Sequence, residues 1–187
     1  MGGPGAGESN IYCDSWRRGA AGYGGKGGST GYIGTYGIVL INANGGDSYG
    51  NLSEPIDLGS GGQYYKGGGA IKIEVSGTLK NEGIISANGK GPLAGSSGGS
   101  IWIQANNLTG MGNISTNGGS GNWDNLVEIF QGSGAGGRIS IEYNNSDFPI
   151  ENLFCEGGEI INNIPEKCKE KALGENGTII INGNQIQ

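Results

Sequence analysis

Three polar side chains recur at one position of a repeated segment. Glu74, Gln104 and Glu142 each follow the second isoleucine of a Gly-Gly-x-Ile-x-Ile motif. If the copies stack as adjacent strands about 4.8 Å apart, the two carboxylates lie roughly 9.5 Å apart across the middle strand. That separation is near the upper end of the range for inverting glycosidases, roughly 6.5–9.5 Å. A solvated strand face, on which Gln104 keeps two like charges apart, explains the pattern without catalysis, and we favour it.

An aromatic residue shares this outward face. Trp102 lies two residues before Gln104, so both side chains point to the same side of a strand. An exposed indole on a flat face can stack on sugar rings or on a neighbouring protein. We favour the alternative, in which a long loop covers the ring. Trp102, Glu74, Gln104 and Glu142 are therefore the candidate ligand-binding residues, with surface glycans as the ligand class.

Composition excludes several functions. The 187 residues include no histidine, so triads with histidine, an imidazole base and common zinc sites are excluded. Two G-x-G-x-x-G segments, at 22–27 and 132–137, lack the following helix of a dinucleotide site. The net charge of −6 argues against a basic nucleic-acid-binding face, and no apolar run approaches the roughly 18 residues of a membrane helix. We expect no enzyme, catalytic residue, cofactor, metal, nucleic-acid partner or membrane insertion.

The chain has an odd number of cysteines, Cys13, Cys155 and Cys168. A disulfide between Cys155 and Cys168 would close a short loop and contribute about 3 kcal/mol. Cys155 nevertheless falls at an inward position of a repeat. That position favours a buried thiol, although the charged segment around Cys168 is long enough to fold back onto it.

Asn-x-Ser/Thr sequons are candidate glycosylation sites if the chain passes through an endoplasmic reticulum. Several lie beside repeated strands, where turn chemistry explains them equally well. The five sequons begin at Asn51, Asn107, Asn113, Asn144 and Asn176.

Two motifs alternate along the chain, and both predict strands because apolar residues recur every second position. Gly-Gly-x-Ile-x-Ile occurs at 68–73, 98–103 and 136–141, with a worn copy at 176–181. Ile-x-Ala/Thr-Asn-Gly occurs at 41–45, 85–89 and 114–118, with a worn copy at 153–157. A fixed order of motifs with variable spacing is typical of repeat arrays.

Stacking the copies in register would bury continuous ladders of apolar side chains. The second motif would also align Asn44, Asn88 and Asn117 as an amide ladder. The first motif predicts two inward columns, Ile71-Ile101-Ile139-Ile179 and Ile73-Ile103-Ile141-Ile181, and the second predicts Ile41-Ile85-Ile114-Leu153. The sequence therefore predicts an all-β protein, a right-handed parallel β-helix (β-solenoid) with long Gly-rich loops.

Glycine supplies 43 residues, and much of it lies in tracts between the motifs. Such tracts are often flexible linkers. Tyrosine and tryptophan within them favour ordered loops, in which backbones approach closely or adopt positive φ. The main tracts are 22–31, 59–69, 95–99 and 132–137.

These motifs resemble the glycine-rich repeat region of large surface proteins of bacteria and protists. The resemblance rests on Gly-Gly-x-Ile-x-Ile followed by Gly-x-Ile-Ser-Ala-Asn-Gly at 69–89, on lead-in segments at 27–31, 35–37 and 55–62, and on a closing motif at 136–141. Glu156 in the asparagine position and an insertion at 160–175 depart from the pattern. The resemblance implies an extracellular β-solenoid that is an adhesin or a structural spacer.

We therefore expect one domain, 1–187, with a Gly/Tyr-rich lead-in at 1–66 and recognisable repeats at 67–187. The expected function is a non-enzymatic extracellular structural or adhesive module at the cell surface. Self-association, or contact with neighbouring repeats of the same protein, would build a filament or surface layer. A carbohydrate-binding or polysaccharide-cleaving β-helix domain is the alternative.

Overall fold

The computed structural model describes residues 3–12 and 15–187, and strands dominate it. The N-terminal strands are β1 (Ser9–Tyr12), β2 (Ser15–Arg18), β3 (Thr30–Ile33), β4 (Val39–Ala43), β5 (Ala70–Lys80) and β6 (Ile84–Ser86). They are followed by β7 (Ser100–Thr109), β8 (Asn113–Ser115), β9 (Gly121–Asp124), β10 (Ile129–Gln131), β11 (Arg138–Ser146) and β12 (Leu153–Phe154). The last strands are β13 (Ile160–Ile161), β14 (Thr178–Ile181) and β15 (Asn184–Gln185), and the helical segments are η1 (Thr35–Gly37), η2 (Ile150–Asn152) and α1 (Glu166–Ala172). The all-β class is confirmed.

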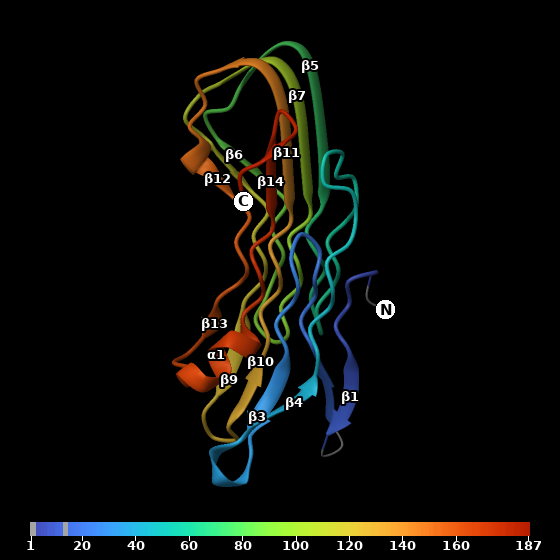
Figure 1. The fold of residues 1–187 in the computed structure, drawn as a ribbon, viewed down its shortest axis with the longest axis vertical. Coiled ribbons are helices and arrows are strands. Elements are labelled where there is room, and N and C mark those ends of the chain that lie inside the picture. Colours follow the sequence, from blue (N-terminus) through green and yellow to red (C-terminus); the bar gives the residue numbers. More distant parts are fainter. Residues whose placement is uncertain (1–2, 13–14) are drawn as a thin grey trace.

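The Gly-Gly-x-Ile-x-Ile copies form one parallel sheet. Strands β5, β7, β11 and β14 lie side by side, and β15 turns back antiparallel on β14. Figure 1 shows β5, β7 and β11 arching over one end of the molecule. Both isoleucine columns form in the predicted register. Ile101, Ile103, Ile139 and Ile141 are at most 1% exposed, so they make the centre of this core.

The second motif supplies the returning strands. Ile85, Ile114 and Leu153 align in the parallel sheet β6-β8-β12 and pack into the same core. Asn88 Oδ1 accepts the Asn117 N–H at 2.7 Å, and Asn117 Oδ1 accepts the Glu156 N–H at 2.9 Å. The predicted ladder therefore joins side chains to the backbone of the next copy.

The first copy of this motif is not part of the stack, which corrects the sequence prediction. Ile41 lies in β4, which pairs antiparallel with β3, and it is partly exposed. The Asn44 side chain bonds Glu8 and no member of the ladder. No copy of Gly-Gly-x-Ile-x-Ile precedes Ile41, so this strand does not return from a strand of the parallel sheet and instead pairs with β3 as a hairpin.

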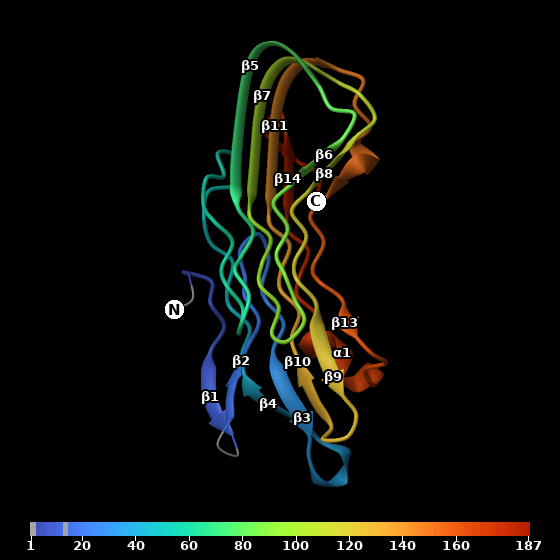
Figure 2. The ribbon, with the colours of Figure 1, turned by 180° about the vertical axis from the view of Figure 1, so that it is seen from behind.

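The opposite end of the molecule is a mixed sheet, β13-β9-β10-β3-β4, with α1 against it (Figures 1 and 2). Its small core contains Trp123, Phe130, Cys168 and Ala172. Because antiparallel and parallel strands mix here and the chain does not close into coils along its length, the right-handed parallel β-helix is not confirmed.

The glycine tracts connect the two ends through the narrow middle of the molecule (Figure 2). Within 132–137, every backbone N–H and C=O has a hydrogen-bond partner. Residues three apart in this tract bond to the same neighbouring segment. The Ser133 N–H donates to the Ala172 carbonyl, and the Gly136 N–H donates to the Glu175 carbonyl. A threefold period without internal hydrogen bonds is typical of polyproline II helices. The segments that surround this tract lie at 21–28, 95–98, 116–119, 158 and 172–175.

Close backbone approach explains why these segments are glycine. A Cβ at Gly134 would overlap the Ser96 carbonyl, and one at Gly98 would overlap the Thr116 carbonyl. The positive-φ glycines among the described residues, such as Gly37 and Gly110, lie outside the tracts. The tracts are therefore ordered, as the sequence indicates, but they form a hydrogen-bonded bundle rather than loops at the corners of a solenoid. We call this feature the glycine bundle.

Candidate functional site

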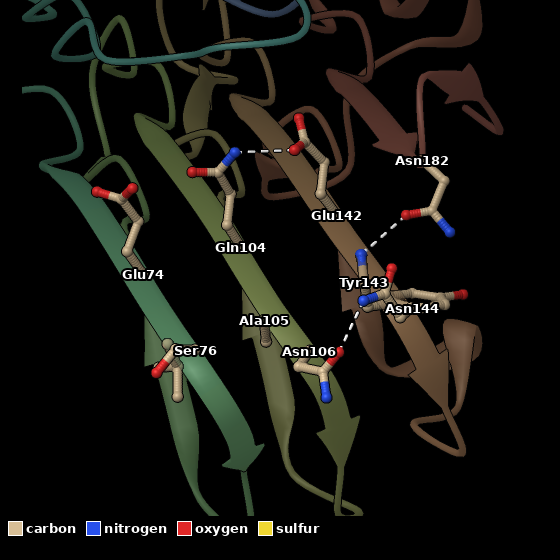
Figure 3. Close-up of a pocket in the computed structure, with 10 residues that line it drawn as sticks. Glu74, Ser76, Gln104, Ala105, Asn106, Glu142, Tyr143, Asn144 and Asn182 are labelled. Atoms are coloured by element: carbon tan, nitrogen blue, oxygen red, sulfur yellow. Dashed lines mark hydrogen bonds between the residues drawn. The ribbon is translucent and has the colours of Figure 1, made fainter.

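A shallow groove crosses the outward face of β5, β7 and β11. Register places Glu74, Gln104 and Glu142 side by side, and all three line the groove (Figure 3). Gln104 Nε2 donates to Glu142 Oε2 at 2.8 Å. The predicted row of outward side chains is therefore present, and its middle amide is bonded to one of its two carboxylates.

Glu74, at the edge of the groove, pairs within its own strand. Its carboxylate lies 2.9 Å from Lys72 Nζ, in an ion pair that is about half exposed. The same ammonium stands 4.0 Å from the centroid of the Trp102 ring. Glu74 and Glu142 thus have different partners, an ammonium and an amide.

Amide side chains extend the groove beyond the carboxylates. Asn144 Nδ2 donates to Asn106 Oδ1 at 2.7 Å, again linking β11 to β7. The Tyr143 N–H donates to Asn182 Oδ1 at 2.9 Å (Figure 3). The groove presents amide donors and carboxylate acceptors at the spacing of adjacent strands, about 4.8 Å. Such an array suits a ligand with many hydroxyl groups.

Trp102 is not exposed, so the glycan-stacking hypothesis for it is wrong. Its side chain is buried at 9% exposure. The segment before β5 crosses this face, because Ser140 Oγ donates to the Ser53 carbonyl and Ser100 Oγ donates to the Asp57 carbonyl, both at 2.6 Å. The covering segment that we expected from the sequence is therefore present, and Trp102 is a packing residue.

Cys155 and Cys168 are free thiols. They lie in different cores, Cys155 among the stacked strands and Cys168 on α1, so the predicted disulfide is not formed. Burial raises the pKa of Cys155 to about 12 and also raises the pKa of Cys168. Cys13 lies outside the described residues.

The sequons have structural partners in several cases. Asn51 Oδ1 accepts the Ser53 N–H at 2.9 Å, as in an Asx turn. The amide nitrogens of Asn107 and Asn144 bond neighbouring strands. Asn176 Oδ1 accepts the Gly157 N–H, and Asn113 is exposed at the start of β8. Turn and ladder chemistry accounts for most of them, and glycosylation stays a prediction.

The structure also reveals a buried cationic network that sequence reasoning missed. Arg138, 5% exposed, donates through Nε and Nη2 to the Tyr49 carbonyl at 3.1 and 2.8 Å. Its guanidinium lies 5.4 Å from the ring centroid of the fully buried Tyr23, whose hydroxyl is 2.6 Å from Ser100 Oγ. Burial lowers the pKa of Arg138 and raises the pKa values of Tyr23 and Tyr49. The network fastens the lead-in region to the parallel sheet.

A second missed feature lies at the far end of the mixed sheet. Two hairpins, β3-β4 and β9-β10, are neighbours there, because the Ile33 N–H donates to the Glu128 carbonyl at 3.0 Å. Tyr36 is 96% exposed on one turn, and Leu126 is 90% exposed on the other. Ile38 and Val127, beside them, are more than half exposed. We call these four residues the apolar tips, and the only sequence signal for them was large apolar residues within turn segments.

Comparison with protein-family models, with curated proteins and with solved structures gives no match for this chain. Among the described residues, no helix is long and apolar enough to cross a membrane. The same part of the chain holds no group of three or more Cys, Asp or Glu side chains placed to bind a metal ion. The candidate features are therefore the polar groove and the apolar tips.

Proposed function

We propose that this chain is a non-enzymatic adhesive and structural module of an extracellular surface protein. The observation that carries the proposal is the group of four exposed residues, the apolar tips, on two neighbouring turns at one end of an elongated, hydrogen-bonded body (Figure 1). Large apolar side chains at such exposure are uncommon when grouped on neighbouring turns, and grouped apolar surface marks contact sites. The extracellular location is supported by the resemblance to surface-protein repeats.

The body suits this role because it resists deformation. The glycine bundle bonds its backbone to several segments at once, and the stacked strands add a buried isoleucine core. The stacked parallel strands support the finer fold proposal, that this chain is a right-handed parallel β-solenoid with long Gly-rich loops. A rigid body holds both tips in a fixed relation, which lowers the entropy lost when they make contact.

Replacing the apolar tips with polar residues should reduce adhesion. We expect the double variant Tyr36→Asn with Leu126→Ser to reduce retention of protein-coated beads on methyl-terminated surfaces and on intact cells by at least about tenfold, because burying each side chain contributes about 1.5–3 kcal/mol. Asparagine suits Tyr36 because its φ is 65°. Bead retention under flow measures the effect.

The matched control removes two other large apolar side chains that are well exposed elsewhere on the molecule. Tyr64 is 70% exposed and Met111 is 71% exposed, so Tyr64→Asn with Met111→Ser tests general stickiness. We expect this control to adhere like the unmodified chain. Equal losses in both double variants, or no loss in either, would contradict adhesion through the tips.

A second candidate function is glycan binding along the polar groove, favoured by the amide and carboxylate row on β7 and β11. Under this proposal, Asn106→Ala with Asn144→Ala should weaken polysaccharide binding by at least about tenfold, because hydrogen bonds to these amides are lost. Because this proposal involves no catalysis, neither the unmodified chain nor Glu142→Gln should shorten the polysaccharide. Isothermal titration and size-exclusion chromatography of the polysaccharide measure both. Shortening of the polymer by the unmodified chain, abolished by Glu142→Gln, would instead indicate a cleaving enzyme.

A further inference from the structure

The isoleucine core is better covered at its β14 end than at its β5 end. Ile101 and Ile139 are fully buried; in β14, Ile179 is 3% exposed and Ile181 is partly buried. Ile71 and Ile73, in the same columns on β5, are only partly buried, as is Ile85 beside them on β6. The difference arises because β14 carries the hairpin partner β15, whereas β5 ends its sheet. Strand β5 therefore leaves apolar side chains uncovered at the open end of the core.

The backbone of β5 is also open along this edge. The Ser100 N–H donates to the Gly69 carbonyl at 3.0 Å. The N–H and C=O of one strand residue point to the same side, and this side alternates from residue to residue. Because the Gly69 carbonyl faces β7, Ile71, Ile73 and Val75 also face β7, up to the register shift that follows Val75. Lys72 and Glu74 consequently turn their backbone groups to the open side. The described N-terminal strands pair elsewhere, as β1-β2 and β3-β4, so no described strand pairs with β5 on this side.

We propose that a second copy of this chain covers this edge, through antiparallel pairing of β5 with β5 of the partner about a twofold axis at Ile73. This inference rests on the proposed role as a surface module and names one of its partners. The pairing extends the sheet across the axis, with β7 and β11 continuing on both sides. A twofold interface of this kind is self-complementary, as most dimer interfaces are.

Charge favours this register over the two registers in which the twofold axis is shifted by one residue. With Ile73 on the axis, Lys72 of each copy lies opposite Glu74 of the other, and both residues present open backbone groups that can exchange two hydrogen bonds. On the inward face, Ile71 then meets Val75 of the other copy. Moving the axis by one residue places either Lys72 opposite Lys72 or Glu74 opposite Glu74, and like charges directly opposite are destabilising.

The other end of the stack favours a closed pair over an open filament. End-to-end growth would require β5 to meet the edge beyond β14. That edge carries β15, which holds Ile180 and Ile181 in antiparallel pairs with Gln185 and Asn184. Because, among the described strands, only β5 is a long open strand at an end of this stack, two copies cover each other's open edge and assembly stops at the dimer.

Sedimentation velocity of the full chain over a wide concentration range tests the proposal. We expect a monomer–dimer equilibrium in which Lys72→Glu alone and Glu74→Lys alone each raise the dissociation constant at least tenfold. The Lys72→Glu/Glu74→Lys double variant restores the opposite pairs and should dimerise like the unmodified chain. An equimolar mixture of the two single variants should form the heterodimer in preference to either homodimer. Glu74→Pro should abolish dimerisation, because proline removes the Glu74 N–H that would bond the partner strand. It should keep the fold, because that N–H faces away from β7.

Circular dichroism and thermal unfolding confirm that each variant is folded. A monomer at every concentration or an open-ended polymer would overturn the proposal. So would Lys72→Glu alone, Glu74→Lys alone or Glu74→Pro dimerising like the unmodified chain, or a double variant that fails to dimerise. Loss of the dimer with bead adhesion through the tips intact would leave the adhesive role standing. If the charge variants change dimerisation as expected but the apolar tips do not adhere, the dimer proposal stands and only the adhesive role is contradicted.

Discussion

Gly134→Ala is expected to lower the free energy of unfolding by about 3 kcal/mol or more, the upper range for overpacking a core. The added methyl would overlap the Ser96 carbonyl. Gly134 donates its N–H to Gly119 and accepts the Gly158 N–H, both at 2.8 Å. Relief of the overlap must therefore move segments that are hydrogen-bonded on several sides. Urea unfolding followed by tryptophan fluorescence measures the loss.

Gly83→Ala is the matched control. A Cβ at Gly83 would have no atom within 4 Å, and its φ is not positive. We expect the control to change the free energy of unfolding by less than about 1 kcal/mol, because alanine mainly restricts the unfolded chain there. Equal effects at the two glycines would contradict a close-packed glycine bundle.

Arg138→Met is expected to destabilise the chain by about 3–4 kcal/mol. Hydrogen bonds to a charged group contribute about 1.5–3 kcal/mol, and a buried acceptor left unpaired adds its desolvation penalty. The Tyr49 carbonyl would lose two donors, while methionine preserves part of the side-chain volume. The denaturant midpoint at unchanged m-value measures this effect.

Lys169→Met provides the comparison. Lys169 forms an ion pair with Glu166 at 3.3 Å, and the pair is largely exposed on α1. Exposed pairs of this kind contribute about 0–1 kcal/mol, so the same substitution should have a small effect. A loss at Lys169 equal to that at Arg138 would show that burial of the Arg138 network is unimportant.

Local alternation predicts much of the stacked sheet. The period of two in Gly-Gly-x-Ile-x-Ile specifies which side chains point inward, and identical copies align in register because a shift would expose isoleucine. Ile101 and Ile139 therefore occupy their predicted positions. The same reasoning places Gln104 beside Glu142 on the outward face.

Other features depend on contacts between distant segments, which the repeat pattern does not encode. The Gly-rich sequence 132–137 has only the small side chains of Ser133 and Ala135, so hydrophobic periodicity does not reveal the partners of its backbone. Ile41 follows the same local motif as Ile85 but pairs with β3, because tertiary context overrides the local pattern. Trp102 is covered by a segment more than forty residues earlier, around Ser53 and Asp57.

Native-state hydrogen exchange most directly tests the central claim, that the glycine tracts form a rigid core which holds the apolar tips. We expect the amides of 132–137 to exchange only through global unfolding, as slowly as those of Ile101 and Ile139. The amides at Tyr36 and Val127, on exposed turns, should exchange quickly. Fast exchange throughout 132–137, while the parallel sheet stays protected, would show that the tracts are loops and would contradict the account.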